Sequence, residues 1–168
     1  AIYNLTRVTL TGNDADKGGA IYSNSGGDAT FMTNVTITGN TANEGGGVSL
    51  DDATLVNVTI VGNTSLNGKG GGFFDEGGVL TATNTIIANN TGGDCESPFD
   101  SSTNSIDSDP VKTCGFATTT DPLLGPLANN GGQTDTMMPQ SGSPAIEGGT
   151  NTGCPTEDQR LQPRPDGA

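Results

Sequence analysis

Apolar and polar residues alternate in a short segment that occurs four times along the chain. The copies begin at residues 7, 34, 57 and 84, so successive copies are 27, 23 and 27 residues apart. In the second copy, NVTITGNT, Val35 and Ile37 alternate with threonines, which is the period-two pattern of a β-strand. A strand that recurs about every 25 residues predicts an all-β solenoid, a right-handed single-stranded parallel β-helix of about four coils.

Two further segments recur within each coil. A glycine-rich turn leads into a short strand whose apolar residue is expected to stack inward, and these residues are Ile21, Val48 and Phe73. A third segment precedes each main strand, at residues 29–32, 53–56 and 79–82. Each predicted coil therefore contains three strands separated by turns.

An asparagine stands between the third segment and the main strand of three coils. Asparagine tolerates the left-handed backbone conformation that a bend needs, and stacked amides can hydrogen-bond to one another. We therefore expect a structural ladder of Asn34, Asn57 and Asn84. N-glycosylation is the alternative for Asn34 and Asn57, because both begin an Asn-Val-Thr acceptor pattern.

The distribution of proline divides the chain. Residues 1–91 contain none, and all nine prolines fall between Pro98 and Pro165. Proline lacks the backbone N–H that a strand paired on both sides must donate. The sequence therefore predicts β-helix repeats over residues 1–91 and an irregular Pro/Gly-rich C-terminal cap over residues 92–168 that packs on them.

Composition agrees with a solenoid and excludes several functions. The 168 residues include 27 glycines but no tryptophan and no histidine, which suits a narrow core with many turns. The formal net charge is −13 and Lys and Arg form no cluster, which argues against a nucleic-acid partner. No apolar run has the length of a membrane span, and zinc is not expected where histidine is absent.

The first residues repeat a sequence found inside the chain. AIYN at residues 1–4 matches AIYS at residues 20–23, so the chain begins partway through a coil. Ala1, Ile2 and Tyr3 would then form an open strand edge, and open edges pair with other chains. This predicts self-association, in its extended form a filament of coils stacked end to end.

The C-terminal half contains an ordered series of short motifs. They are GGDC (92–95), TCGF (113–116), DPLLGPL (121–127), NNGG (129–132), GSPAI (142–146) and CPTEDQR (154–160). With NTIIANNT before them, they resemble the bacterial "choice-of-anchor Q" family over most of the chain from about residue 31. The resemblance implies a secreted or surface-displayed parallel β-helix, related in shape to pectate lyases and polymorphic outer-membrane repeats. It implies an extracellular location and no established catalytic activity.

Two departures from the family concern the tail. Family members have a histidine where this chain reads TDTMM (134–138), and they continue beyond RPDG with a further cysteine. A secreted setting permits a disulfide between Cys95 and Cys114, which would contribute about 3 kcal/mol in the chain-entropy model. Cys154 is left over and is either free or bonded to another chain. The resemblance implies that its partner is the further cysteine that family members have after RPDG.

Acidic residues recur at corresponding turns and raise two hypotheses of site chemistry. The residues are Asp28, Asp51, Asp52 and Asp75. They could bind calcium, or supply the two carboxylates of a polysaccharide lyase or hydrolase, but solvated acids at turns are the favoured interpretation. We therefore expect no catalytic residue and no cofactor, with calcium as a secondary hypothesis.

Threonines on the strands allow one more alternative. Thr9, Thr36 and Thr59 would stack into a flat ladder of the kind that ice-binding β-helices present, but threonine is also simply a good strand residue. The favoured prediction is a non-enzymatic extracellular structural or surface protein. The alternatives are an adhesin or glycan-binding module, a polysaccharide-degrading enzyme and an ice-binding protein.

Overall fold

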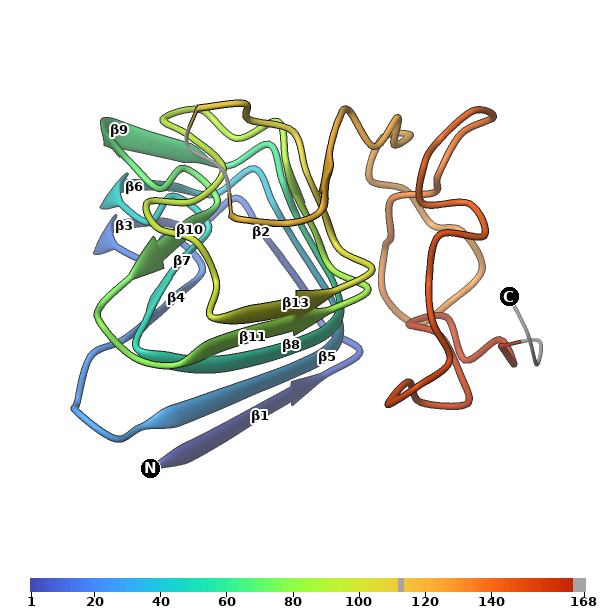
Figure 1. The fold of residues 1–168 in the computed structure, drawn as a ribbon, viewed down its shortest axis with the longest axis horizontal. Helices are drawn as coiled ribbons and strands as arrows, with labels where there is room; N and C mark the ends of the chain where they lie inside the picture. The colour runs from blue at the N-terminus through green and yellow to red at the C-terminus, as the bar shows by residue number, and fades with distance from the viewer. Residues whose placement is uncertain (112–113, 165–168) are drawn as a thin grey trace.

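The computed structural model describes residues 1–111 and 114–164. The last three residues of the RPDG motif, after Arg164, lie outside these residues. Within them the chain forms 15 β-strands and no helix. Successive coils lie on top of one another, and all pairings between the named strands are parallel (Figure 1). The predicted parallel β-helix is confirmed.

The strands form three sheets. Sheet A contains β1 (Ile2–Thr6), β2 (Thr9–Thr11), β5 (Ala29–Thr38), β8 (Asp52–Val61), β11 (Leu80–Thr83), β12 (Ile86–Ala88), β13 (Ser101–Thr103), β14 (Ile106–Asp107) and β15 (Thr118–Thr119). Sheet B contains β3 (Asp14–Lys17), β6 (Thr41–Glu44) and β9 (Thr64–Lys69). Sheet C contains β4 (Ile21–Ser23), β7 (Val48–Leu50) and β10 (Phe73–Asp75).

Equivalent apolar residues of successive coils lie directly above one another. Ile37 pairs with Ile60 in sheet A, and both side chains are fully buried. In sheet C, Val48 pairs with Ile21 on one side and with Phe73 on the other, as the glycine-turn pattern predicts. The core is therefore a set of short apolar columns, each extended by one residue per coil.

The pattern of apolar residues did not reveal sheet B. Its strands read DADK, TANE and TSLNGK, and most of their side chains are not buried. Three coils contribute to all three sheets, whereas later strands add to sheet A alone. Strand pairing continues beyond residue 91, because β13 pairs with β11 and β14 pairs with β12.

An aromatic cluster and a disulfide close the last coil. The Phe99 ring packs edge-on against Phe73 and Phe116, with ring centroids 5.0 and 5.3 Å apart. Cys95 and Cys114 form the predicted disulfide, and both are fully buried in the same cluster. The crosslink ties Cys114 to the coil that contains Cys95, within the same buried cluster as the three rings.

The chain after β15 runs along the side of the stack. Figure 1 shows this segment, in orange and red, beside the coils rather than across their end. Its hydrogen bonds with the coils begin at Asn104 and reach back to Thr9 in the first coil. This arrangement places residues 120–164 against the bend at which the two halves of sheet A meet.

Candidate ligand-binding groove

The bends of sheet A form a column of left-handed residues. Arg7, Asn34, Asn57, Asn84 and Asn104 have φ angles of 57°, 57°, 54°, 49° and 48°. Asparagine is among the few non-glycine residues that adopt this conformation readily. The Asn57 amide donates to Asn34 Oδ1 at 3.2 Å, and the Asn84 amide donates to Asn57 Oδ1 at 3.1 Å. We call these five residues the bend column.

The C-terminal segment binds the bend column one coil after another. Asn104 Nδ2 donates to the carbonyl of Gly148 at 2.8 Å. Asn84 makes a pair of bonds with Thr150, donating to its carbonyl at 2.8 Å and accepting from its N–H at 2.9 Å. Asn34 Nδ2 donates to the carbonyl of Glu157 at 2.9 Å. The asparagines therefore hold the bends and also position the segment along the stack.

The same contacts bear on the glycosylation alternative. Asn34 is 1% exposed, and its amide nitrogen already donates to Glu157. The amide nitrogen of Asn57 donates within the column. A glycan on Asn34 would displace the C-terminal segment from the stack.

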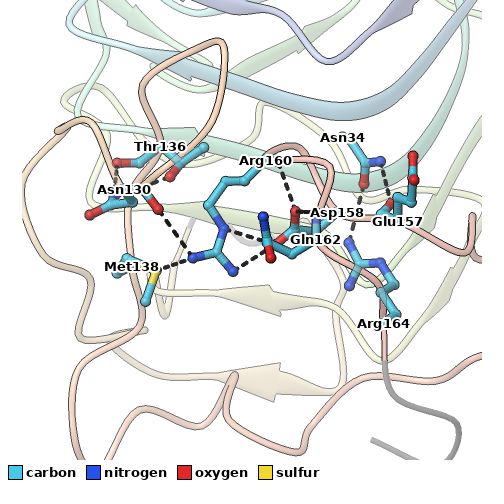
Figure 2. Close-up of polar contacts among 9 residues, drawn as sticks. All are labelled: Asn34, Asn130, Thr136, Met138, Glu157, Asp158, Arg160, Gln162 and Arg164. Carbon is cyan, nitrogen blue, oxygen red and sulfur yellow. Dashed lines mark hydrogen bonds and ion pairs between the residues drawn. The ribbon is translucent and has the colours of Figure 1, made fainter.

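A hairpin near the end of the described chain is organised by one carboxylate. Asp158 Oδ1 accepts the backbone N–H of Arg160 at 2.7 Å and that of Gln162 at 3.0 Å (Figure 2). Its Oδ2 accepts Arg160 Nε at 2.8 Å and pairs with Arg160 Nη2 at 2.7 Å. Burial opposes ionisation, but the hydrogen bonds from Gln162 and Arg160 outweigh it and hold the pKa of Asp158 below its usual value of 3.8.

Replacing Asp158 with asparagine is expected to loosen this hairpin. The pKa is depressed in the folded state, so the stabilisation is complete at neutral pH and is lost as the pH falls from about 4 through the folded-state pKa. In Asp158→Asn an amide replaces a carboxylate beside Arg160, and the Gln162 amide should exchange its hydrogen about 10- to 100-fold faster at neutral pH.

Hydrogen exchange measured by mass spectrometry tests this expectation, with the exposed Asp14→Asn as the charge-matched control. In the wild type, protection of the Gln162 amide should also decrease below pH 4, after correction for intrinsic exchange. In Asp158→Asn the protection of this amide should not show that decrease. Equal exchange at Gln162 in the three proteins would contradict the assigned role.

The bend column and the C-terminal segment enclose a groove of about 270 Å³. Its floor is formed by side chains of sheet A: Asn34, Thr36, Asn57, Thr59, Asn84 and Ile86. Its walls include Leu124, Thr136, Met137, Met138, Pro139, Asp158, Gln159, Arg160 and Arg164. Amides, hydroxyls and guanidinium groups thus face the same space as several apolar side chains, a combination typical of small-ligand sites.

The predicted threonine ladder forms part of this covered face. Gln159 accepts from Thr36 Oγ1 at 2.8 Å and donates to Thr9 Oγ1 at 3.0 Å, and Thr36 is only 2% exposed. Thr9 also donates to the carbonyl of Asp135. Residues 134–159 therefore occupy the surface that an ice crystal would need.

The predicted acidic residues bind the turns around them. Asp51 accepts the N–H of Gly26, Asp52 that of Val79 and Asp75 that of Gly77. Asp28 accepts the amino group of Ala1. The described part of the chain contains no group of three or more His, Cys, Asp or Glu side chains arranged to hold a metal ion. The contacts of these carboxylates are with backbone groups, and for Asp28 and Asp75 also with the hydroxyls of Tyr3 and Ser97, rather than with one another.

Cys154 lies beside the groove with its thiol free. Its Sγ is 2.8 Å from Asn84 Nδ2 and 3.2 Å from Asn57 Oδ1. The third cysteine thus contributes to the docking of the C-terminal segment on the bend column.

A second asparagine ladder, which the alternation of apolar and polar residues does not predict, runs through the stack, and its two central members, Asn40 and Asn63, are buried. Asn13, Asn40, Asn63 and Asn90 pass hydrogen bonds from coil to coil, and the buried carboxylate of Asp94 accepts the last of them. The available signal was that each copy of the repeated segment has asparagine at its seventh position. A polar residue directly after a strand normally indicates an exposed turn, so this signal alone does not predict a buried ladder.

The described residues define the class of the protein as a parallel β-helix of short repeats. A family model for the Chlamydia polymorphic membrane protein repeat matches residues 7–24, the stretch from the first bend residue through β4. The fold and this short match fit a repeat protein of the polymorphic outer-membrane type, which agrees with a surface or outer-membrane location. Searches of curated proteins and of solved structures returned no match. None of the described residues belongs to a helix long and apolar enough to cross a membrane.

Proposed function

We propose that the chain is a non-enzymatic surface module that presents a small ligand-binding groove on a rigid β-helix. The observation that supports this most directly is the groove of about 270 Å³ between the bend column and the C-terminal segment. Parallel coils with continuous ladders give such a groove a stable floor, because each floor residue is fixed by the coils on both sides. The repeat match to a polymorphic membrane protein supports display at the surface.

Labelling of intact cells tests the location. An antibody raised against the largely exposed peptide 140–149 should label intact cells of the organism that makes the protein. An antibody against a cytoplasmic protein, which should label only permeabilised cells, is the control. Labelling of the chain only after permeabilisation would contradict the proposal.

The non-enzymatic part of the proposal is tested separately. Its support is that Asp51, Asp52 and Asp75 are engaged by backbone N–H groups of turns. Neither uronate-containing nor neutral polysaccharides should yield new reducing ends or unsaturated products. Turnover that disappears in the double variant Asp51→Asn/Asp52→Asn would instead establish an enzyme.

The ordered motifs of the C-terminal half support a finer assignment to the choice-of-anchor Q type of surface protein. GGDC (92–95) contributes Cys95 to the disulfide, and CPTEDQR (154–160) contributes to the hairpin on the bend column. Self-association through β1 is a secondary proposal, supported by Ile2 and Tyr3, which are 70% and 46% exposed. Sedimentation as a monomer at all concentrations would overturn it.

A further inference from the structure

The few cationic side chains of this acidic chain are unevenly placed. The formal net charge is −13, yet all three arginines, Arg7, Arg160 and Arg164, lie where the C-terminal segment meets the coils. Arg160 and Arg164 line the groove itself. The groove therefore differs from the rest of the surface, which would repel an anion.

Two of the three arginines are already neutralised by carboxylates. Arg7 pairs with Glu157 at 2.9 Å, and Arg160 pairs with Asp158 through Nε and Nη2 at 2.8 and 2.7 Å. These pairs hold the hairpin in place and provide no surplus charge for a ligand.

Arg164 is held differently. Its Nη2 donates to the neutral Asn34 Oδ1 at 3.2 Å (Figure 2). Its Nε is buried and has no hydrogen-bond partner among the residues that the structure describes. Arg7 Nε is buried without a partner as well. Arg164 differs in that no carboxylate of the described residues pairs with it, so its charge is not neutralised. A carboxylate is the acceptor whose planar geometry matches a guanidinium best. Arg164 is thus the group in the groove with unused capacity for an anion.

The remaining lining suits a sugar ring. Thr59, Asn57 and Asn84 bring hydroxyl and amide groups to the floor, while Met137 and Pro139 supply apolar surface opposite. A pyranose has hydroxyl groups around its rim and C–H groups on its faces, so it needs both kinds of contact. The volume of about 270 Å³ lies just below the usual range of ligand sites, about 300 to 1,000 Å³, and suits one ring rather than a chain of rings.

We propose that the groove binds a single sugar ring bearing a carboxylate, with Arg164 as the anchor of the carboxylate. The inference names the ligand class for the groove of the proposed function and rests on that function. The Thr59 hydroxyl and the second N–H of the Asn57 amide, whose first N–H donates to Asn34, hold the ring hydroxyls, and the apolar wall packs against a ring face. Binding of one exposed sugar is weak, with a dissociation constant on the order of 1 mM.

The test is calorimetric or NMR titration of the purified chain with methyl glucuronide and methyl glucoside, which differ in the carboxylate. The glucuronide should bind at least about 10-fold more tightly than the glucoside. Arg164→Gln should weaken glucuronide binding about 10- to 100-fold and leave the glucoside unchanged. Lys69→Gln is the matched control, because it removes the same charge from β9, where Lys69 pairs with Glu44.

Two further arms separate the alternatives. Thr59→Val on the groove floor should weaken both sugars equally, and it keeps the inference testable if Arg164→Gln disturbs the hairpin. Sodium acetate should bind much more weakly than the glucuronide. Equal binding of acetate, equal binding of the two sugars, or no binding of either at millimolar concentration would overturn the inference. Surface labelling would be unaffected by any of these results, so failure of the ligand assignment can be distinguished from failure of the proposed location.

Discussion

Gly46→Ala is expected to destabilise the chain by about 4 kcal/mol or to prevent folding altogether. A Cβ at Gly46 would lie 2.3 Å from Thr64 C, 2.4 Å from Thr64 O and 2.6 Å from Gly71 O. All three are backbone atoms of the next coil, so no rotamer change can relieve the overlap. The coils would have to separate at this turn. That separation would break the hydrogen bond from Gly46 N–H to Gly70 O, which is 3.1 Å long.

Urea unfolding followed by far-UV circular dichroism measures the effect. Gly125→Ala is the control, because its Cβ would meet its nearest atom, Met138 O, at 3.4 Å and its φ lies outside the left-handed range. The control should change the free energy of unfolding by less than about 0.5 kcal/mol. An unchanged unfolding midpoint in Gly46→Ala would show that the coils are not stacked as closely as described.

Asn63→Ala is expected to cost about 4 kcal/mol of unfolding free energy through the interior ladder. Asn63 is fully buried, and its Oδ1 accepts the backbone N–H and the side-chain amide of Asn40 at 3.0 and 2.9 Å. Its Nδ2 donates to Ile37 O and to Asn90 Oδ1, both at 3.1 Å. Alanine leaves the Asn40 backbone N–H without this acceptor and removes one partner from each of Asn40 Nδ2, Ile37 O and Asn90 Oδ1. Each buried group left unpaired costs about 1–3 kcal/mol.

The control for this prediction is Asn67→Ala, which removes the same side chain from an exposed position of β9 and should be nearly neutral. A double variant, Asn40→Ala/Asn63→Ala, should lose less than the sum of the single variants, because the Asn40–Asn63 contact can be lost only once. Additive losses, or a stability of Asn63→Ala equal to that of Asn67→Ala, would mean that the ladder does not act as a connected network.

The two asparagine ladders have different consequences for function. The interior ladder stabilises the stack and does not line the groove. The bend column stabilises each bend and also binds the C-terminal segment, so it forms the groove floor and part of its support. Variants of the interior ladder should therefore affect stability alone, whereas variants of the bend column should affect both stability and any ligand bound in the groove.

The sequence by itself determined the coil stack. Ile37 and Ile60 pair as the repeat spacing required, and Asn34, Asn57 and Asn84 occupy left-handed bends. These features depend on residues within one repeat and on the equivalent residues of the next coil. Such contacts repeat at a fixed interval, so they leave a periodic pattern that can be read from one sequence.

Only the tertiary structure decided where the C-terminal segment lies and what it encloses. Gln159 meets Thr36, and Arg164 meets Asn34, across 123 and 130 residues of sequence. These contacts are made by single side chains of a segment without repeats, so no periodic pattern in the sequence predicts them. The interior ladder is not predicted for a related reason: Gly47 and Gly72 approach it so closely that a Cβ on them would lie 3.2 and 2.7 Å from the amide nitrogens of Asn63 and Asn90. The groove therefore exists because an irregular segment hydrogen-bonds to polar side chains of a regular stack. These hydrogen bonds form only in the folded chain.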